Sequence, residues 1–400
     1  SGISITDERF TNAKGGITDI EALQTTNGTN YIQVGANAEG TSISSLIGGT
    51  GADTFDASRF NKDIWMSMGD GGDEVTFFSR ARIASSTLIG GDGTDTLLLS
   101  DATTTIIDDD LANVSTVEVL AASMQDTFIL IGENALLAGI ERVIGDIGSD
   151  EIDVSEYTAS INISGAAGND TFIVSSGDHL QGDVIDGGAD TDELQFAIEA
   201  LSITDADFGG VSALEVVRLR EGNNRVLLGT SSETAGITTI IGGAGLDTIS
   251  ALDRTVGIDI VMDGEKLGAG SAPANSIDLA SVQGGAGIDT LSIVYTYDNP
   301  DDPILQVYTF SDNLFERVGS FGRLDGKGAI EAFETEALGN DYEFGLNAFS
   351  AGITTIYGHG ADILDATNYD DLLGGTLPSL NFVFATSAEL LGDPLAGFWR

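Results

Sequence analysis

The sequence predicts an all-β fold, a parallel β-solenoid with about 20 residues per coil. Three observations predict it: a long internal repeat, a glycine–aspartate motif that recurs inside the repeat, and a composition suited to tight turns. The 400 residues include 53 glycines and 5 prolines, and 42% of them are hydrophobic. This glycine content is about twice ordinary usage, and it favours many turns between short strands. No stretch has a convincing amphipathic helical pattern.

Four sequence repeats of about 97 residues follow one another. A glutamate beside a short apolar run recurs with spacings of 97, 97 and 116 residues, and a glycine follows it at a constant distance. Because such markers keep one register, we expect one continuous solenoid made of repeats 1–102, 103–199, 200–304 and 305–400, the last with a C-terminal cap. We interpret the glycines as turns and the glutamates as solvated strand positions, with a ligand or glycan-binding row as the alternative. The markers are Glu21, Glu118, Glu215 and Glu331, and Gly35, Gly132, Gly229 and Gly345.

A glycine–aspartate motif recurs within the repeats and first reads Gly48-Gly49-Thr50-Gly51-Ala52-Asp53. Close copies occupy 90–95, 242–247 and 284–289, and looser copies occupy 68–73, 145–150, 165–170 and 187–192. The step between motifs is 20 to 22 residues in repeats 1 and 2, and runs such as TFDAS and TLLLS between them predict strands. One step holds two short strands and two turns, so we expect one coil per step and about five coils per repeat.

The residue types in the motif point to a hard cation. Glycine permits positive φ, so the turn can direct carbonyl oxygens to one point, and the aspartate adds a carboxylate there. Such oxygens suit Ca²⁺ better than Mg²⁺. Coils about 4.8 Å apart would also align the aspartates, which would repel by roughly 3.5 kcal/mol per adjacent pair without a cation. The alternative is that these are Asp-Gly turns exposed to water.

The motifs resemble the GGxGxDxUx pattern of the RTX (repeats-in-toxin, hemolysin-type calcium-binding) proteins. This resemblance implies a calcium-binding β-roll. It differs in that the motif occurs once per coil, from which we expect one row of ions along one edge. The motif is lost at 263–267 and 374–378, where we expect no ion. The implied ligands are Asp53, Asp73, Asp95, Asp150, Asp170, Asp192, Asp247 and Asp289, with motif glycines Gly48, Gly51, Gly90, Gly93, Gly242, Gly245, Gly284 and Gly287 supplying turn carbonyls.

Composition argues against several other classes of protein. The chain has 63 Asp and Glu against 16 Lys and Arg, a net charge of −47, so we expect neither nucleic acid nor an anionic membrane surface as a partner. It has no cysteine, which excludes disulfides and thiolate metal sites, and no apolar run long enough to span a membrane. His179 and His359 are far apart in sequence, and no nucleophile elbow or phosphate-binding loop occurs, so we expect no enzyme.

We therefore expect an extracellular or cell-surface structural protein: a subunit of a surface layer, sheath or filament that calcium rigidifies and assembles. The RTX resemblance implies type I secretion, and the start at Ser1 is consistent with a processed product, a fragment, or an export signal elsewhere. The expected partners are calcium, further copies of the chain and a cell-surface polysaccharide. The apolar stretch 381–400 is either an assembly end or a plug over the last coil. The alternatives are an RTX adhesin or ligand-binding stalk and, third, the repeat region of an extracellular polysaccharide-acting enzyme.

Overall fold

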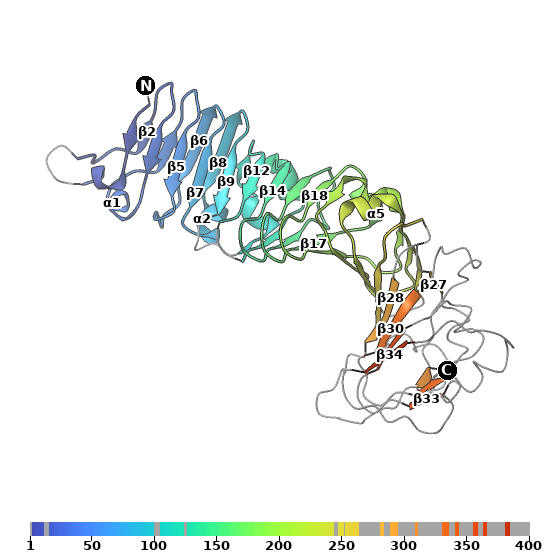
Figure 1. The fold of residues 1–400 in the computed structure, drawn as a ribbon. Helices are drawn as coiled ribbons and strands as arrows, with labels where there is room; N and C mark the ends of the chain where they lie inside the picture. The colour runs from blue at the N-terminus through green and yellow to red at the C-terminus, as the bar shows by residue number, and fades with distance from the viewer. Residues whose placement is uncertain are drawn as a thin grey trace. The chain divides into compact units, whose positions relative to one another are not determined.

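The predicted all-β parallel solenoid is confirmed (Figure 1). The structure is a computed structural model that describes residues 2–11, 16–99, 105–123, 126–243, 247–251 and 253–263, followed by short strands between 281 and 384. It forms two compact bodies, which are described separately. The first contains Ser1–Ser175, Gly182–Leu194 and Gly210–Leu214; the second contains Ser176–Gln181, Gln195–Gly209 and Glu215–Arg400.

Parallel strands in the first body form three rows. A ten-stranded sheet has the order β1 (Ser4–Ile5), β3 (Tyr31–Gln33), β5 (Thr54–Ala57), β7 (Glu74–Phe77), β9 (Thr96–Leu99), β12 (Val119–Ala121), β14 (Arg142–Ile144), β16 (Asn162–Ser164), β18 (Val184–Asp186) and β21 (Val211–Ser212). A five-stranded sheet contains β2 (Ala22–Gln24), β4 (Ser45–Ile47), β6 (Trp65–Asp70), β8 (Thr87–Asp92) and β11 (Val114–Ser115). The third row contains β10 (Thr105–Ile106), β13 (Phe128–Leu130), β15 (Glu151–Asp153), β17 (Thr171–Val174) and β19 (Glu193–Phe196).

The second body has the same parallel pattern of strands. One row contains β22 (Val216–Arg218), β24 (Thr239–Ile241), β26 (Asp259–Asp263), β28 (Asp289–Val294), β30 (Ile330–Thr335), β32 (Thr355–Gly358) and β34 (Asn381–Phe384). A four-stranded sheet contains β20 (Ser202–Ile203), β23 (Arg225–Leu227), β25 (Thr248–Ser250) and β27 (Ser281–Gln283). A three-stranded sheet contains β29 (Thr309–Phe310), β31 (Asp341–Glu343) and β33 (Ile363–Asp365).

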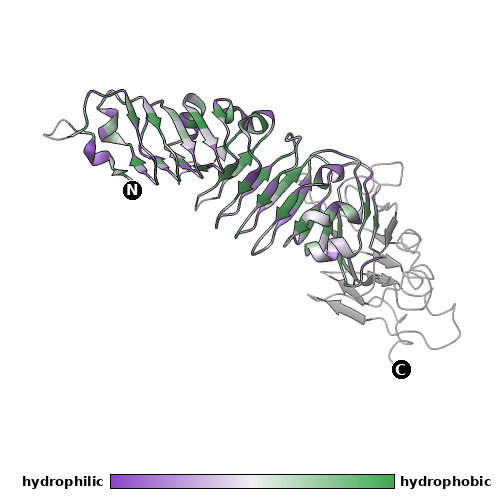
Figure 2. Ribbon diagram, turned by 90° about the horizontal axis from the view of Figure 1, so that it is seen from above, coloured by the Kyte–Doolittle hydropathy of each residue, from purple (hydrophilic) through white to green (hydrophobic). Residues whose placement is uncertain are grey.

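The core of each row is a line of apolar side chains in the same register. In the ten-stranded sheet Ile32 pairs with Phe55 and Phe55 with Val75, and all three side chains are fully buried. Each such burial contributes roughly 1.5–3 kcal/mol. The strands are largely hydrophobic in Figure 2, whereas the turns between them are mostly hydrophilic. Strand and turn chemistry therefore alternate along the chain as the sequence predicts.

Repeat length and coil register do not coincide. Four register steps lead from Tyr31 to Val119 in the ten-stranded sheet, whereas the residue 97 positions after Tyr31 is Phe128, in the third row. Paired residues in this sheet lie 20 to 27 positions apart, as in Thr54 with Glu74 and Ser4 with Tyr31. Repeat 1 thus takes four coils and one further side. The expectation of five coils per repeat is wrong here, because most coils of repeat 1 take 22 or 23 residues and not 20.

This extra side moves the motif turns to a new edge in the next repeat. In repeat 1 the turn at Gly48 joins β4 of the five-stranded sheet to β5 of the ten-stranded sheet. In repeat 2 the equivalent turn at Gly145 joins β14 of the ten-stranded sheet to β15 of the third row. The expectation of a single row of sites along one edge is therefore wrong: the row ends with repeat 1 and resumes one edge further round.

Short helices, which the sequence did not reveal, occupy the connections that carry no strand. The α-helices are α1 (Ala36–Glu39), α2 (Arg80–Ser85), α3 (Glu133–Ala138), α4 (Gly177–Leu180) and α5 (Thr230–Ala235), and the 3₁₀-helices are η1 (Asp7–Arg9), η2 (Asp108–Leu111) and η3 (Asp205–Gly210). Within the described residues, no helix is both long and apolar enough to cross a membrane.

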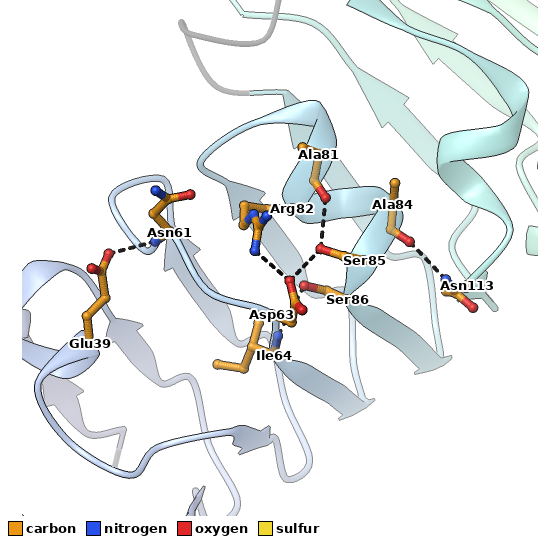
Figure 3. A network of polar contacts seen from close by, with 10 residues as sticks. All are labelled: Glu39, Asn61, Asp63, Ile64, Ala81, Arg82, Ala84, Ser85, Ser86 and Asn113. Atoms are coloured by element: carbon orange, nitrogen blue, oxygen red, sulfur yellow. Dashed lines mark hydrogen bonds and ion pairs between the residues drawn. The ribbon is translucent and has the colours of Figure 1, made fainter.

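Side-chain hydrogen bonds link these connections from one coil to the next (Figure 3). The Asp63 carboxylate accepts hydrogen bonds from Arg82 and Ser85 of α2, each at 2.5 Å. One coil further, the side chain of Asn113 donates to the carbonyl oxygen of Ala84 at 2.9 Å. Polar side chains thus connect successive coils where strand ladders are absent.

Candidate cation site: a ladder of buried aspartates

The motif aspartates are buried, not exposed in turns. Each described member follows the motif turn and immediately precedes or begins the next strand. Their side chains are at most 2% exposed: Asp53, Asp73, Asp95, Asp150, Asp170, Asp192 and Asp247. The alternative of water-exposed Asp-Gly turns is therefore wrong. A buried carboxylate needs compensating partners, so each oxygen of these side chains should have a hydrogen-bond donor or a cation beside it.

One oxygen of each aspartate joins its coil to the coil before. The backbone N–H of Asp53 donates to Asp73 Oδ1 at 2.6 Å, and the N–H of Asp73 donates to Asp95 Oδ1 at 2.9 Å. Repeat 2 has the same ladder, in which the N–H of Asp150 donates to Asp170 and that of Asp170 to Asp192, both at 2.8 Å. These bonds extend the sheet hydrogen bonding across the turn and hold the coils in register.

We call each side chain that accepts the N–H of the preceding coil a rung of the ladder. The second carboxylate oxygen, Oδ2, distinguishes two kinds of aspartate rung. Asp53 Oδ2 accepts the N–H of Gly49 at 3.1 Å, and Asp150 Oδ2 accepts the N–H of Asp146 at 3.1 Å. In contrast, the buried Oδ2 atoms of several further aspartates have no hydrogen-bond partner, among them Asp73, Asp95 and Asp170. In these three turns the residue four positions earlier has positive φ, whereas Gly49 and Asp146 do not.

The motif glycines bring oxygen atoms close to these carboxylates. A Cβ on Gly90 would lie 1.7 Å from the carbonyl oxygen of Thr116 and 2.5 Å from Asp95 Oδ2. Gly93 has φ +140°, and a Cβ there would lie 1.5 Å from the carbonyl oxygen of Gly71 in the preceding coil. Glycine is therefore required both for the left-handed backbone and for the close stacking of turn carbonyls.

Burial without a counter-charge alters the acidity of these groups. Burial raises the pKa of Asp73 to about 6; the N–H of Asp53 opposes this rise, and the carboxylates of Asp95, Asp53 and Asp70 add to it. Burial likewise raises the pKa of Asp170 to about 6, with further contributions from neighbouring carboxylates. The pKa of Asp95, Asp150 and Asp247 is also raised, chiefly by burial. Ionisation of these buried aspartates is therefore less favourable than ionisation of an exposed aspartate.

The oxygen atoms around the ladder are of the kind that a hard cation binds. In the described part of the chain, no three carboxylate or imidazole side chains gather closely enough to hold a metal ion by themselves. A cation would instead have to combine an unsatisfied aspartate oxygen with turn carbonyls, all of them oxygen ligands of the kind Ca²⁺ accepts.

Of the other predicted residues, Gly242 donates its N–H to the carbonyl of Val261 at 2.8 Å. The Asp289 side chain and Gly245, Gly284 and Gly287 lie outside the described residues, as do 264–267 and 374–378.

The ladder also includes residues that do not belong to the glycine–aspartate motif. Asn30 and Thr127 hold the first rung of repeats 1 and 2, where their backbone N–H groups donate to Asp53 and Asp150, both at 2.8 Å. Asn224 does the same toward Asp247 at 2.9 Å. Glu118 ends the first ladder, because it accepts the N–H of Asp95 at 2.8 Å. The signal was the 97-residue spacing of positions 30, 127 and 224, which the double-glycine pattern hides.

The marker glycines have a different role from turns. Gly35, Gly132 and Gly229 are the N-caps of α1, α3 and α5. At each cap an aspartate from the preceding coil accepts three backbone N–H groups, as Asp205 does from Gly229, Ser231 and Ser232 at 2.6, 2.9 and 2.9 Å. A Cβ on Gly229 would lie 3.1 Å from the Asp205 carboxyl. Although burial opposes it, these N–H groups lower the pKa of Asp205.

The remaining candidates of the sequence do not join the ladder. Glu21 is exposed, and His179 lies in α4. Arg220 donates to the carbonyl oxygen of Ala197 at 2.7 Å. Comparison of the chain with family models, with curated proteins and with solved structures gave no match.

Proposed function

We propose that this chain is a calcium-dependent structural solenoid of the extracellular space, a subunit of a surface layer, sheath or filament. The observation that supports it is the set of buried aspartate oxygens without partners at Asp73, Asp95 and Asp170. Leaving a buried carboxylate oxygen unsatisfied costs about 1–3 kcal/mol or more. A divalent cation beside each oxygen would replace this cost, and the repulsion between carboxylates, with attraction.

Calcium would therefore be part of the fold and not a catalytic group. A ligand that binds only the folded chain stabilises it in proportion to its free concentration. Extracellular calcium sites commonly have dissociation constants of about 10⁻⁴–10⁻³ M, which matches the calcium outside cells and not the much lower level inside. The net charge of −47 gives calcium a second role, because neutralising the chain reduces repulsion between copies.

A structural role also agrees with the outward surface of the ten-stranded sheet. One outward row runs through Gln33, Asp56, Thr76, Leu98 and Ala121, and it continues with Ile144, Ser164 and Asp186. This row mixes acidic, polar and apolar side chains. A solenoid that binds a repeating ligand on a flat face would need one residue type along the row, so the row favours the structural role over an adhesin.

Electron microscopy and sedimentation of the full chain, with and without calcium, test this proposal. We expect assembled material in millimolar calcium that disperses when a chelator is added, together with a higher melting temperature in calcium. A monodisperse monomer at millimolar calcium would overturn the assembly role. A melting temperature that calcium and chelator leave unchanged would overturn the calcium dependence itself.

A further inference from the structure

Two rungs of the ladder carry asparagine where the motif has aspartate. The Asn30 side chain is 2% exposed and that of Asn224 is 1% exposed. In both, Oδ1 accepts the N–H of the preceding coil, from Ile3 at 3.0 Å and from Leu201 at 2.9 Å. This is the bond that the Oδ1 of a motif aspartate makes, so the two asparagines belong to the same ladder.

The other side-chain atom, Nδ2, points at three oxygen atoms. Asn30 Nδ2 lies 2.9 Å from the carbonyl oxygen of Thr26, 2.7 Å from that of Gly28 and 2.7 Å from Asp53 Oδ1. Asn224 Nδ2 repeats the arrangement two repeats later, at 2.8 Å from Arg220 O, 3.2 Å from Gly222 O and 2.8 Å from Asp247 Oδ1. Two turn carbonyls and the carboxylate of the next coil therefore converge on a single donor group.

The aspartate rungs have a closely related turn. The residue two positions before the side chain has positive φ in both kinds of rung: +113° at Gly28 and +103° at Gly222 before the asparagines, against +106° at Gly51, +151° at Gly71 and +140° at Gly93 before aspartates. The next coil also supplies a carboxylate in each case, as Asp95 does after Asp73. An aspartate in place of either asparagine would put a second oxygen where the N–H₂ group now lies, facing two turn carbonyls and a carboxylate.

We propose that the amide groups of Asn30 and Asn224 take the place of the cation, so that the first rungs of repeats 1 and 3 are held without metal. This inference rests on the proposed calcium binding at the aspartate rungs. An uncharged amide donates to the oxygens that elsewhere need a cation, and it adds no charge of its own. Repeats 1 and 3 would then each begin with a metal-independent coil pair from which the calcium-dependent coils extend.

Exchange of the two residue types in the full chain tests the inference. The Asn30→Asp variant should bind one more calcium ion per chain than the unaltered protein, and in chelator it should melt a few degrees lower. Calcium should restore its melting temperature. The reverse change, Asp73→Asn, should bind fewer calcium ions and melt a few degrees higher in chelator, because the amide replaces a buried carboxylate oxygen that has no hydrogen-bond donor.

Two control variants separate this from general effects of charge and packing. Asp70→Asn removes one charge from an exposed side chain in the same turn as Asp73, so it should leave the calcium count unchanged and alter melting less than Asp73→Asn. Asn30→Ala removes the amide and adds no carboxylate, so it should melt lower with and without calcium and gain no ion. Calcium is counted by equilibrium dialysis and elemental analysis, and melting is followed by circular dichroism.

The outcomes distinguish this inference from the proposed function. If the unaltered chain binds no calcium, the proposed function fails, and the inference fails with it. If the unaltered chain binds calcium but Asn30→Asp gains no ion, or Asp73→Asn melts no higher than Asp70→Asn in chelator, the proposed function stands and the inference is overturned.

Discussion

In calcium-free buffer the chain should become more stable as the pH falls from about 7 to about 4. Asp73 and Asp170 are buried, and burial raises the pKa of each from its ordinary value of 3.8 to about 6. A carboxyl group that binds its proton more tightly in the folded state stabilises the fold at low pH. This stability is fully present below the unfolded pKa and is lost as the pH rises through about 6.

The size of the effect follows from the two pKa values. A rise from 3.8 to about 6 corresponds to about 3 kcal/mol for each group, and therefore to about 6 kcal/mol for the two together. The raised pKa values of Asp95, Asp150 and Asp247 act in the same direction. The lowered pKa values of Asp56 and Asp205 act in the opposite direction and only below their ordinary range. Stability should therefore stop rising once the pH falls below the ordinary pKa of aspartate.

Urea unfolding followed by circular dichroism, at several pH values in chelator, measures this dependence. The Asp73→Asn variant should lose about 3 kcal/mol of it between pH 7 and 4, whereas the exposed Asp70→Asn variant should keep nearly all of it. High salt should change the result little, because the groups are buried. Stability that stays level or falls as the pH drops from 7 to 5 in chelator would refute the electrostatic account of the ladder.

Two further perturbations test the cap and the stacked turns. Asp205→Asn replaces a carboxylate that accepts three N–H groups at the start of α5, so it should lower the free energy of unfolding by about 1–2 kcal/mol at neutral pH. The difference from the unaltered protein should vanish as the pH falls below the lowered pKa of Asp205. A difference that persists at low pH would mean that the charge of Asp205 does not stabilise the cap. Gly93→Ala should lower the free energy of unfolding by more than about 2 kcal/mol, because its Cβ would overlap the Gly71 carbonyl at φ +140°. Gly209→Ala is the matched control, since nothing lies within 4 Å of the added Cβ. Equal melting temperatures for the two variants would contradict the close stacking of the turns.

The sequence predicted the solenoid and the positions of the motif turns better than it predicted how the repeats are placed around the coil. Glycine–aspartate spacing located Asp53, Asp73 and Asp95 at turns, because glycine adopts positive φ more readily than other residues. The 97-residue spacing could not reveal that a repeat advances by one side of the coil, since Tyr31 and Phe128 look equivalent in sequence while they lie in different rows.

Side-chain partners between coils were beyond the sequence for a different reason. Each depends on which residue lies above which, and that register varies from 20 to 27 residues along the ten-stranded sheet. Asp205 caps a helix whose first residue is 25 positions later, and α5 is too short to show a helical period. Asn30 has no double glycine before it, so the motif does not place it in the ladder, whereas its bonds to Ile3 and Asp53 do.

Anomalous scattering from a crystal of the full chain grown in calcium tests the central claim most directly, since it locates calcium without assumptions about stability. The account predicts calcium peaks in the turns beside Asp73, Asp95 and Asp170, on one edge in repeat 1 and on the next edge in repeat 2, and no peak beside Asn30 or Asn224. Ordered motif turns without calcium in a calcium-saturated crystal, with the aspartate oxygens bonded to water or protein donors instead, would contradict it.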